Sequence, residues 1–210
     1  MDKQKRFSAI GIVARLKPLH NGAELMLEAA CENADHVIIG IGSSNRYDLR
    51  NPFTAEESEA MVHACLQPKY TNYKIIYVPD FGHLDPAYRD GQKWRCYIKE
   101  NFSPLDAFIS GNDYVVNLLK EDYQIIHPAS LIPRKMWIKL HATQVRYEMA
   151  RGNNWKQFVP ARVAEYFETN KLVDRFRREF GLQTLQEVHG IQEAAKEKSA
   201  LEEQKHSWGE

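Results

Sequence analysis

The stretch FSAIGIVARLKPLHNGAELML, residues 7–27, contains a near-continuous apolar run, a short loop, and then apolar residues at helical spacing. The apolar run predicts a strand, Phe7 to Ala14, that is covered on both faces. In the loop, Pro18 stiffens the turn and Gly22 allows the backbone to approach a ligand closely. Unpaired amides at the start of a helix attract anions. The stretch therefore predicts a phosphate-binding turn, with His20 pointing into the same space.

The rest of the chain alternates between strand and helix patterns. Thr54, three residues before Glu57, is typical of a capping box at the start of a helix. Further strands are expected at 36–42, 73–79, 105–110 and 124–128, and helices at 22–33, 55–66, 92–101, 113–120 and 143–151, the last ended by Gly152. This order predicts an α/β fold, a Rossmann-like doubly wound parallel sheet of about five strands with C-terminal helices.

Parallel sheets of this kind bind ligands beyond the carboxyl ends of their strands, near the point where the strand order reverses. We therefore expect the site to collect the loops that follow Ala14, Gly42, Pro79 and Ser110. Beyond residue 182 the composition shifts to Glu, Gln, Lys and Ala, which predicts a domain over 1–182 and a helical, partly solvated tail over 183–210.

The composition excludes several classes of protein. Lys plus Arg equals Asp plus Glu at 28 each, so no overall charge draws the chain to nucleic acid or to an anionic membrane. No apolar run approaches the ~20 residues of a membrane span. Three widely spaced cysteines, Cys31, Cys65 and Cys96, are expected to be reduced thiols of a cytoplasmic protein. No metal-ligand spacing is present among them.

An anion must therefore be held by local cations. Arg46 and Arg50 lie in the loop after the second predicted strand. Thr143 and Arg146 lie three residues apart at the start of a helix, where Thr143 could cap the helix and Arg146 could present a guanidinium fork to phosphates. Together with Arg15, these residues predict a clamp for a nucleoside triphosphate.

In their order and in their residues, these segments resemble the nucleotidyltransferase superfamily that has a His-x-Gly-His loop. Within it, they resemble the archaeal-type nicotinamide-mononucleotide adenylyltransferases. The resemblance covers roughly residues 7–170 and rests on several segments together: Ala14–Ala23 for the first loop, Asn51–Thr54 for Asp/Asn-Pro-Phe-Thr, Ser110–Asn112 for Ser-Gly-Asn, and Thr143, Val145 and Arg146 for Ser-Gly/Ser-Thr-x-Ile/Val-Arg.

The resemblance implies adenylyl transfer from ATP to nicotinamide or nicotinate mononucleotide, with Mg²⁺ on the phosphates, in a protein expected to be a homo-oligomer. The residues it implies for ATP are Arg15, His20, Gly22, Ala23, Asn112, Thr143 and Arg146, of which His20, Arg15 and Arg146 would be catalytic. Those it implies for the mononucleotide are Arg50, Asp80, Phe81 and Trp94. From the residues alone, Trp94 is equally well explained as part of the core.

Four positions depart from the family pattern. Ala14 replaces a glycine, His141 a serine, and Ser58 an arginine, while Ala23 replaces the second histidine of the first loop. Loss of one phosphate donor lowers the rate of comparable sites by ~10²–10³. Two other functions therefore stay open: a nucleotide-binding sensor or regulatory protein with impaired catalysis, and a cytidylyl- or adenylyltransferase for another phosphorylated small molecule.

Overall fold

The computed structural model describes residues 5–190 and has a parallel sheet of five strands in the order β3-β2-β1-β4-β5. The reversal of strand order beside β1 is the switch point of a doubly wound α/β fold, as predicted. The strands are β1 Phe7–Ala14, β2 Ala34–Gly42, β3 Tyr73–Val78, β4 Ala107–Ile109 and β5 Gln124–Ile126. The helices are α1 Asn21–Asn33, α2 Ala55–Leu66, α3 Phe81–Leu84, α4 Gln92–Phe102, α5 Asp113–Leu119, α6 Ala142–Arg151, α7 Ala161–Thr169 and α8 Leu172–Phe176.

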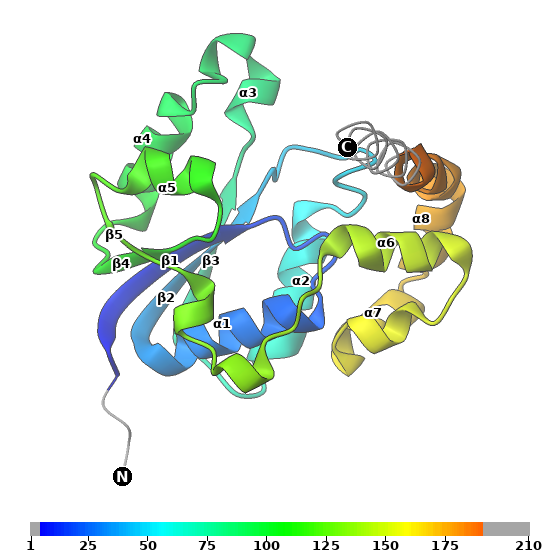
Figure 1. Ribbon diagram of the computed structural model, residues 1–210, viewed down its shortest axis with the longest axis horizontal. Helices are drawn as coiled ribbons and strands as arrows, with labels where there is room; N and C mark the ends of the chain where they lie inside the picture. The colour runs from blue at the N-terminus through cyan, green and yellow to red at the C-terminus, as the bar shows by residue number, and fades with distance from the viewer. Residues whose placement is uncertain (1–4, 191–210) are drawn as a thin grey trace, which may run out of the picture.

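The sheet is the middle of three layers, with α1 and α2 on one face and α4 and α5 on the other (Figure 1). Strand register explains this division, because alternate residues of a strand face opposite sides. Ile12 pairs with Ile39 of β2 and Ile109 of β4, and all three belong to the cluster beneath α1 and α2. Their neighbours Ile38 and Phe108 belong to the cluster beneath α4.

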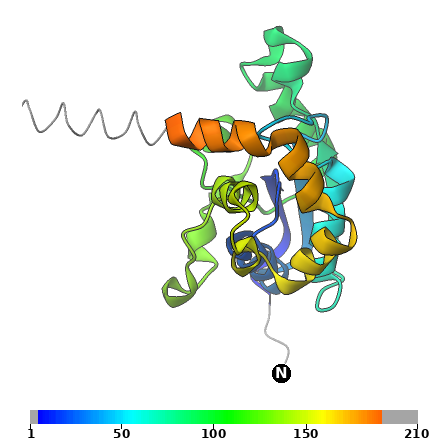
Figure 2. The same cartoon turned by 90° about the vertical axis from the view of Figure 1, so that its right-hand side faces the viewer.

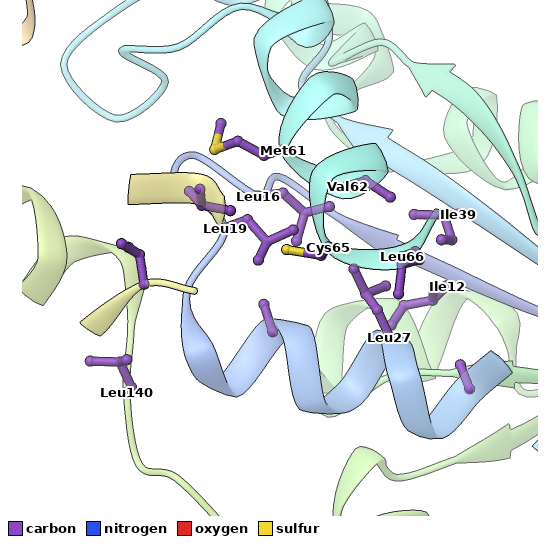
Figure 3. Close-up of a cluster of buried hydrophobic side chains, with 14 of the residues drawn as sticks. Ile12, Leu16, Leu19, Leu27, Ile39, Met61, Val62, Cys65, Leu66 and Leu140 are labelled. Carbon is purple, nitrogen blue, oxygen red and sulfur yellow. The ribbon is translucent and has the colours of Figure 1, made fainter. Parts of the chain in front are cut away.

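The larger core fills the space between β1, β2, α1 and α2 (Figure 3). Leu16 and Leu19, from the loop after β1, point into this cluster and are almost completely buried. The first loop is therefore fixed from below by apolar packing, which leaves its backbone and remaining side chains to face the carboxyl edge of the sheet.

The structure alters some predicted boundaries. The expected loop from Asp80 to Gly91 contains α3 and a 3-10 turn, Pro86–Tyr88, because the side chains of Asp80 and Asp85 accept backbone N–H bonds at the two helix starts. The strand expected at 105–110 is shorter than predicted, because β4 runs only from Ala107 to Ile109. The capping box of Thr54 and Glu57 is present, as is the left-handed Gly152 that ends α6.

The chain is helical without interruption from 172 to 190, with a π-helical turn at Arg177–Gly181 (Figure 2). This stretch packs against the first turn of α2 and against the loop that follows β2. Arg175 holds both carboxylate oxygens of Glu57, at 2.6 and 2.7 Å, and the Tyr47 hydroxyl donates to Glu179. The proposed division at residue 182 stays a prediction, and residues 191–210 of the expected tail lie outside the described residues.

None of the helices within residues 5–190 is long and apolar enough to cross a membrane. All three cysteines are free thiols, and Cys31 and Cys65 are buried. Burial in apolar surroundings raises the pKa of the Cys31 thiol to about 12, so it is protonated and unreactive at neutral pH.

Arg175 is expected to stabilise the fold more than a surface cation does, because its carboxylate partner is mostly buried and would be left without a counter-charge. Replacing Arg175 with Met should lower the free energy of unfolding by about 1–3 kcal/mol in urea denaturation. Lys156→Met is the matched control, since Lys156 and Glu168 are about half exposed, and it should cost at most about 0.5 kcal/mol. Equal effects of the two variants would contradict this interpretation.

Candidate functional site

Two adjoining cavities open at the carboxyl edge of the sheet. The first, of about 750 Å³, lies among the loops that follow β1, β2, β3 and β4, and we call it the sheet-edge cavity; its lining includes Arg46, Asp80, Phe81, Trp94, Asn112 and Tyr114. The second, of about 810 Å³, lies between the start of α1 and the start of α6, and we call it the α6 cavity; its lining includes Lys17, His20, Ala23, Arg50, His141 and Thr143. All four predicted strand-end loops thus contribute to one cavity.

The two cavities share part of their walls. Ala14, Arg15, Met26 and Pro128 line both of them. Arg15 is exposed and follows the last residue of β1, at the switch point of the sheet. A ligand in each cavity would therefore meet its neighbour beside the guanidinium of Arg15.

His20 is the N-cap of α1, and its Nδ1 accepts the backbone N–H of Ala23 at 3.2 Å. An imidazole that accepts at Nδ1 carries its proton on Nε2 when it is neutral. Burial, with a smaller effect of His141, lowers the pKa of His20 to about 4. At neutral pH the ring is therefore uncharged and can donate one hydrogen bond from Nε2.

Lys17 is almost completely buried beneath the first loop. Its Nζ donates to the carbonyl oxygens of Ser43 at 2.9 Å and Arg46 at 3.2 Å, so that the loops after β1 and β2 are held together. Burial lowers the pKa of the Lys17 ammonium to about 8. The sequence does not indicate this role, because nothing in the pattern around Lys17 predicts that it is buried.

Arg146 is buried rather than presented as an open fork. Its Nη1 donates to the carbonyl of Lys17 at 2.9 Å, and its Nη2 donates to the hydroxyl of Thr143 at 3.1 Å. The expectation that Thr143 caps the helix is wrong, because α6 begins at Ala142 and its N-cap is His141. Thr143 instead lies in the first turn and accepts from Arg146, and both residues line the α6 cavity.

The sheet-edge cavity brings together three of the four residues expected to bind the mononucleotide. The carboxylate of Asp80 pairs with Arg46 at 3.2 Å, and Phe81 packs against Tyr97 with ring centroids 5.5 Å apart. Trp94, on α4, is half-buried; it packs against the smaller core cluster and also lines the cavity. One part of the Trp94 side chain therefore belongs to the core, and another part lines the cavity.

Arg50 and Asn112 line different cavities. Arg50 lines the α6 cavity, and its exposed guanidinium pairs with Glu187 at 2.8 Å. Asn112 lines the sheet-edge cavity, where its side chain accepts the N–H of Val115 and caps α5. Gly22 and Ala23 line the α6 cavity, as expected of residues at the start of α1.

The strap between β5 and α6, residues 128–140, forms the outer wall of the α6 cavity and was expected only as a loop. Its apolar side chains Met136, Trp137 and Ile138 line the cavity and are about half exposed. His127, just before the strap, also lines this cavity, and its Nδ1 accepts the N–H of Ala129. The available signal was the number of large apolar residues in this loop, Leu131, Ile132, Met136, Trp137 and Ile138, because solvated loops rarely carry so many.

The cap at His20 predicts a pH dependence of stability. The unfolded chain binds a proton near the ordinary pKa of 6.5, whereas folded His20 does so only near 4, so stability should fall as the pH falls through this interval. His20→Asn keeps a capping oxygen that does not titrate. Between about pH 7 and about pH 5, urea denaturation should show the wild type losing about 1–2 kcal/mol more than His20→Asn. Equal losses would show that His20 titrates normally.

Comparison with known proteins agrees with this geometry. The family described as cytidylyltransferase-like matches residues 15–147. A nicotinamide-nucleotide adenylyltransferase of Thermococcus kodakarensis is 33% identical over 172 residues, which cover 79% of this chain and 85% of that protein. The corresponding protein of Picrophilus torridus is 31% identical over 168 residues, which cover 79% of this chain and 94% of that protein.

Among solved structures, a bifunctional NMN adenylyltransferase/ADP ribose pyrophosphatase from Francisella tularensis, complexed with AMP and manganese, superposes with a TM-score of 0.65 at 19% identity. The superposition covers 90% of this chain and 55% of that longer one, and it supports the fold. The strand order, the loop after β1 and the match over most of the chain lead to one conclusion: this protein belongs to the cytidylyltransferase-like nucleotidyltransferase family.

Proposed function

We propose that the protein transfers the adenylyl group of ATP to nicotinamide mononucleotide or nicotinate mononucleotide, forming NAD or deamido-NAD and pyrophosphate. The observation that carries this proposal is the shared wall of the two cavities at Arg15. A reaction that joins two nucleotides needs two pockets that meet where the new bond forms. The names of the relatives supply the substrates.

The linings of the two cavities favour one assignment of the substrates. The α6 cavity would hold ATP, because its polar lining includes the exposed cations Arg15 and Arg50 and the starts of two helices, α1 and α6. The sheet-edge cavity would hold the mononucleotide, because Phe81 and Trp94 offer aromatic faces for the pyridine ring. Arg46 and Asp80 would be polar partners within that cavity.

The chemistry would be an in-line displacement. A phosphate oxygen of the mononucleotide attacks the α-phosphorus of ATP, a new oxygen–phosphorus bond forms, and the bond to the β-phosphate oxygen breaks and releases pyrophosphate. No protein nucleophile is required, so positioning and charge stabilisation suffice. Arg15 at the shared wall would stabilise the negative charge near the reacting phosphorus, while His20 would donate from Nε2 to a phosphate oxygen.

We further propose that Mg²⁺ enters with ATP. Within residues 5–190 no group of three acidic, histidine or cysteine side chains is placed to hold a metal ion. The cationic lining of the α6 cavity fits phosphates rather than a bare cation, so the metal would be held by the triphosphate. When bound there, Mg²⁺ would neutralise charge on the phosphates.

The direct test is pyrophosphate release from Mg-ATP and each pyridine mononucleotide by the purified protein. Arg15→Ala should lower kcat about 10²-fold or more, because its charge acts mainly where the transition state gains charge. Arg162→Ala, at an exposed position on α7 outside both cavities, is the control and should leave kcat unchanged. Binding of ATP without release of pyrophosphate in the wild type would instead support the sensor or regulatory function.

Trp94 provides a separate test of the mononucleotide assignment. Trp94→Leu keeps apolar bulk against the core cluster but removes the aromatic face. Stacking of a base on an aromatic ring contributes about 1–3 kcal/mol, so KM for the mononucleotide should rise about tenfold or more. The KM for ATP should stay the same. A large fall in Tm with both KM values unchanged would assign Trp94 to the core alone.

A further inference from the structure

We propose that His141 contacts the phosphates of the nucleotide opposite His20, and so supplies from α6 the second imidazole that Ala23 cannot provide. The proposal rests on the proposed function only in taking ATP as the ligand of the α6 cavity. His20, Ala23 and His141 all line that cavity, so the alanine and the two histidines face one space.

The starts of α1 and α6 are held against each other across this cavity. A Cβ built on Gly22 would lie 3.4 Å from the carbonyl oxygen of Ile138 and 3.3 Å from Nδ1 of His20. The strap thus touches the start of α1 three residues before His141. On the other side of the cavity, Arg146 ties the first turns of α6 to the carbonyl of Lys17. His141 therefore has little freedom to move away from the first loop.

The two imidazoles also interact electrostatically. Burial is the larger cause of the lowered pKa of His20, and the neighbouring His141 is the second. An electrostatic effect of this kind weakens with distance, which agrees with the position of both residues on the wall of one cavity. A phosphate chain that enters between them could accept a hydrogen bond from each ring.

His141 differs from the other two histidines of this cavity in how its ring is used. His20 and His127 each accept a backbone N–H at Nδ1, which commits one nitrogen to the local turn. His141 is the N-cap of α6, but its side chain makes no capping hydrogen bond. Its ring is exposed at the cavity and can offer either nitrogen to a ligand. No such donor exists at Ala23, whose methyl group is buried.

The decisive variant is His141→Ser, because serine is a good helix N-cap and removes only the imidazole. We expect about a tenfold or greater rise in KM for ATP and a fall in kcat, by analogy with loss of one oxyanion donor. The Kd of AMP should change less than that of ATP. His36→Ala, which removes an exposed imidazole near the amino end of β2, is the matched control and should behave as the wild type.

A second variant moves the imidazole rather than deleting it. In Ala23→His/His141→Ser the ring is placed on α1, in the same cavity, and activity should recover to well above that of His141→Ser. Ala23→His alone is the control: if His141 already supplies this donor, Ala23→His should raise activity much less in the wild type than in His141→Ser, whereas equal factors would reject the role of His141. If His141→Ser lowers Tm strongly, His141→Asn, which also caps helices, replaces it in the same comparisons.

Each outcome decides between the two proposals. If the wild type forms dinucleotide and His141→Ser does so with unchanged KM and kcat, the role of His141 is wrong and the proposed function stands. If the wild type forms no dinucleotide with either mononucleotide, the proposed function fails, and the Kd of ATP then decides on His141. A tenfold weaker Kd in His141→Ser would support the phosphate contact, and an equal Kd would reject it.

Discussion

The site depends on one buried residue, Lys17. Its ammonium donates hydrogen bonds to two carbonyl oxygens of the loop after β2. Its own carbonyl oxygen accepts a hydrogen bond from the guanidinium of Arg146, on α6. An ammonium taken out of water loses several kcal/mol of hydration, which only such partners offset. Two elements far apart in the sequence, the loop after β2 and α6, are therefore fixed relative to the first loop. The walls of both cavities follow from this arrangement.

This arrangement divides the cations of the site into two kinds. Lys17 and Arg146 are buried and have their donors occupied by protein oxygens, so they act as braces. Arg15 and Arg50 are exposed and line the α6 cavity, and Arg50 also pairs with Glu187. A protein with no net charge can in this way have a strong positive charge at one cavity. The buried cations hold the loops in place, and the exposed cations lie at the cavity wall.

The strands and the fold follow from the sequence because apolar runs and the Thr54–Glu57 capping box are local signals. The position of His20 on a cavity wall follows from its place in the loop after β1, and that of Trp94 follows only from the resemblance. The burial of Arg146 and the N-cap at His141 do not follow, because both depend on packing between α6 and the first loop. The sequence also does not indicate which cavity Arg50 and Asn112 each line, because this depends on how the loops fold over the edge of the sheet.

The shared wall at Arg15 has a consequence for what happens after the reaction. Under the proposed function, each substrate occupies one cavity, whereas the dinucleotide product occupies both and is a bivalent ligand. Once one half is bound, the other half is at a high effective concentration, so the product should bind more tightly than either mononucleotide alone. Departure of pyrophosphate leaves the product held by two pockets at once. Turnover would then be governed by escape from the enzyme rather than by bond formation.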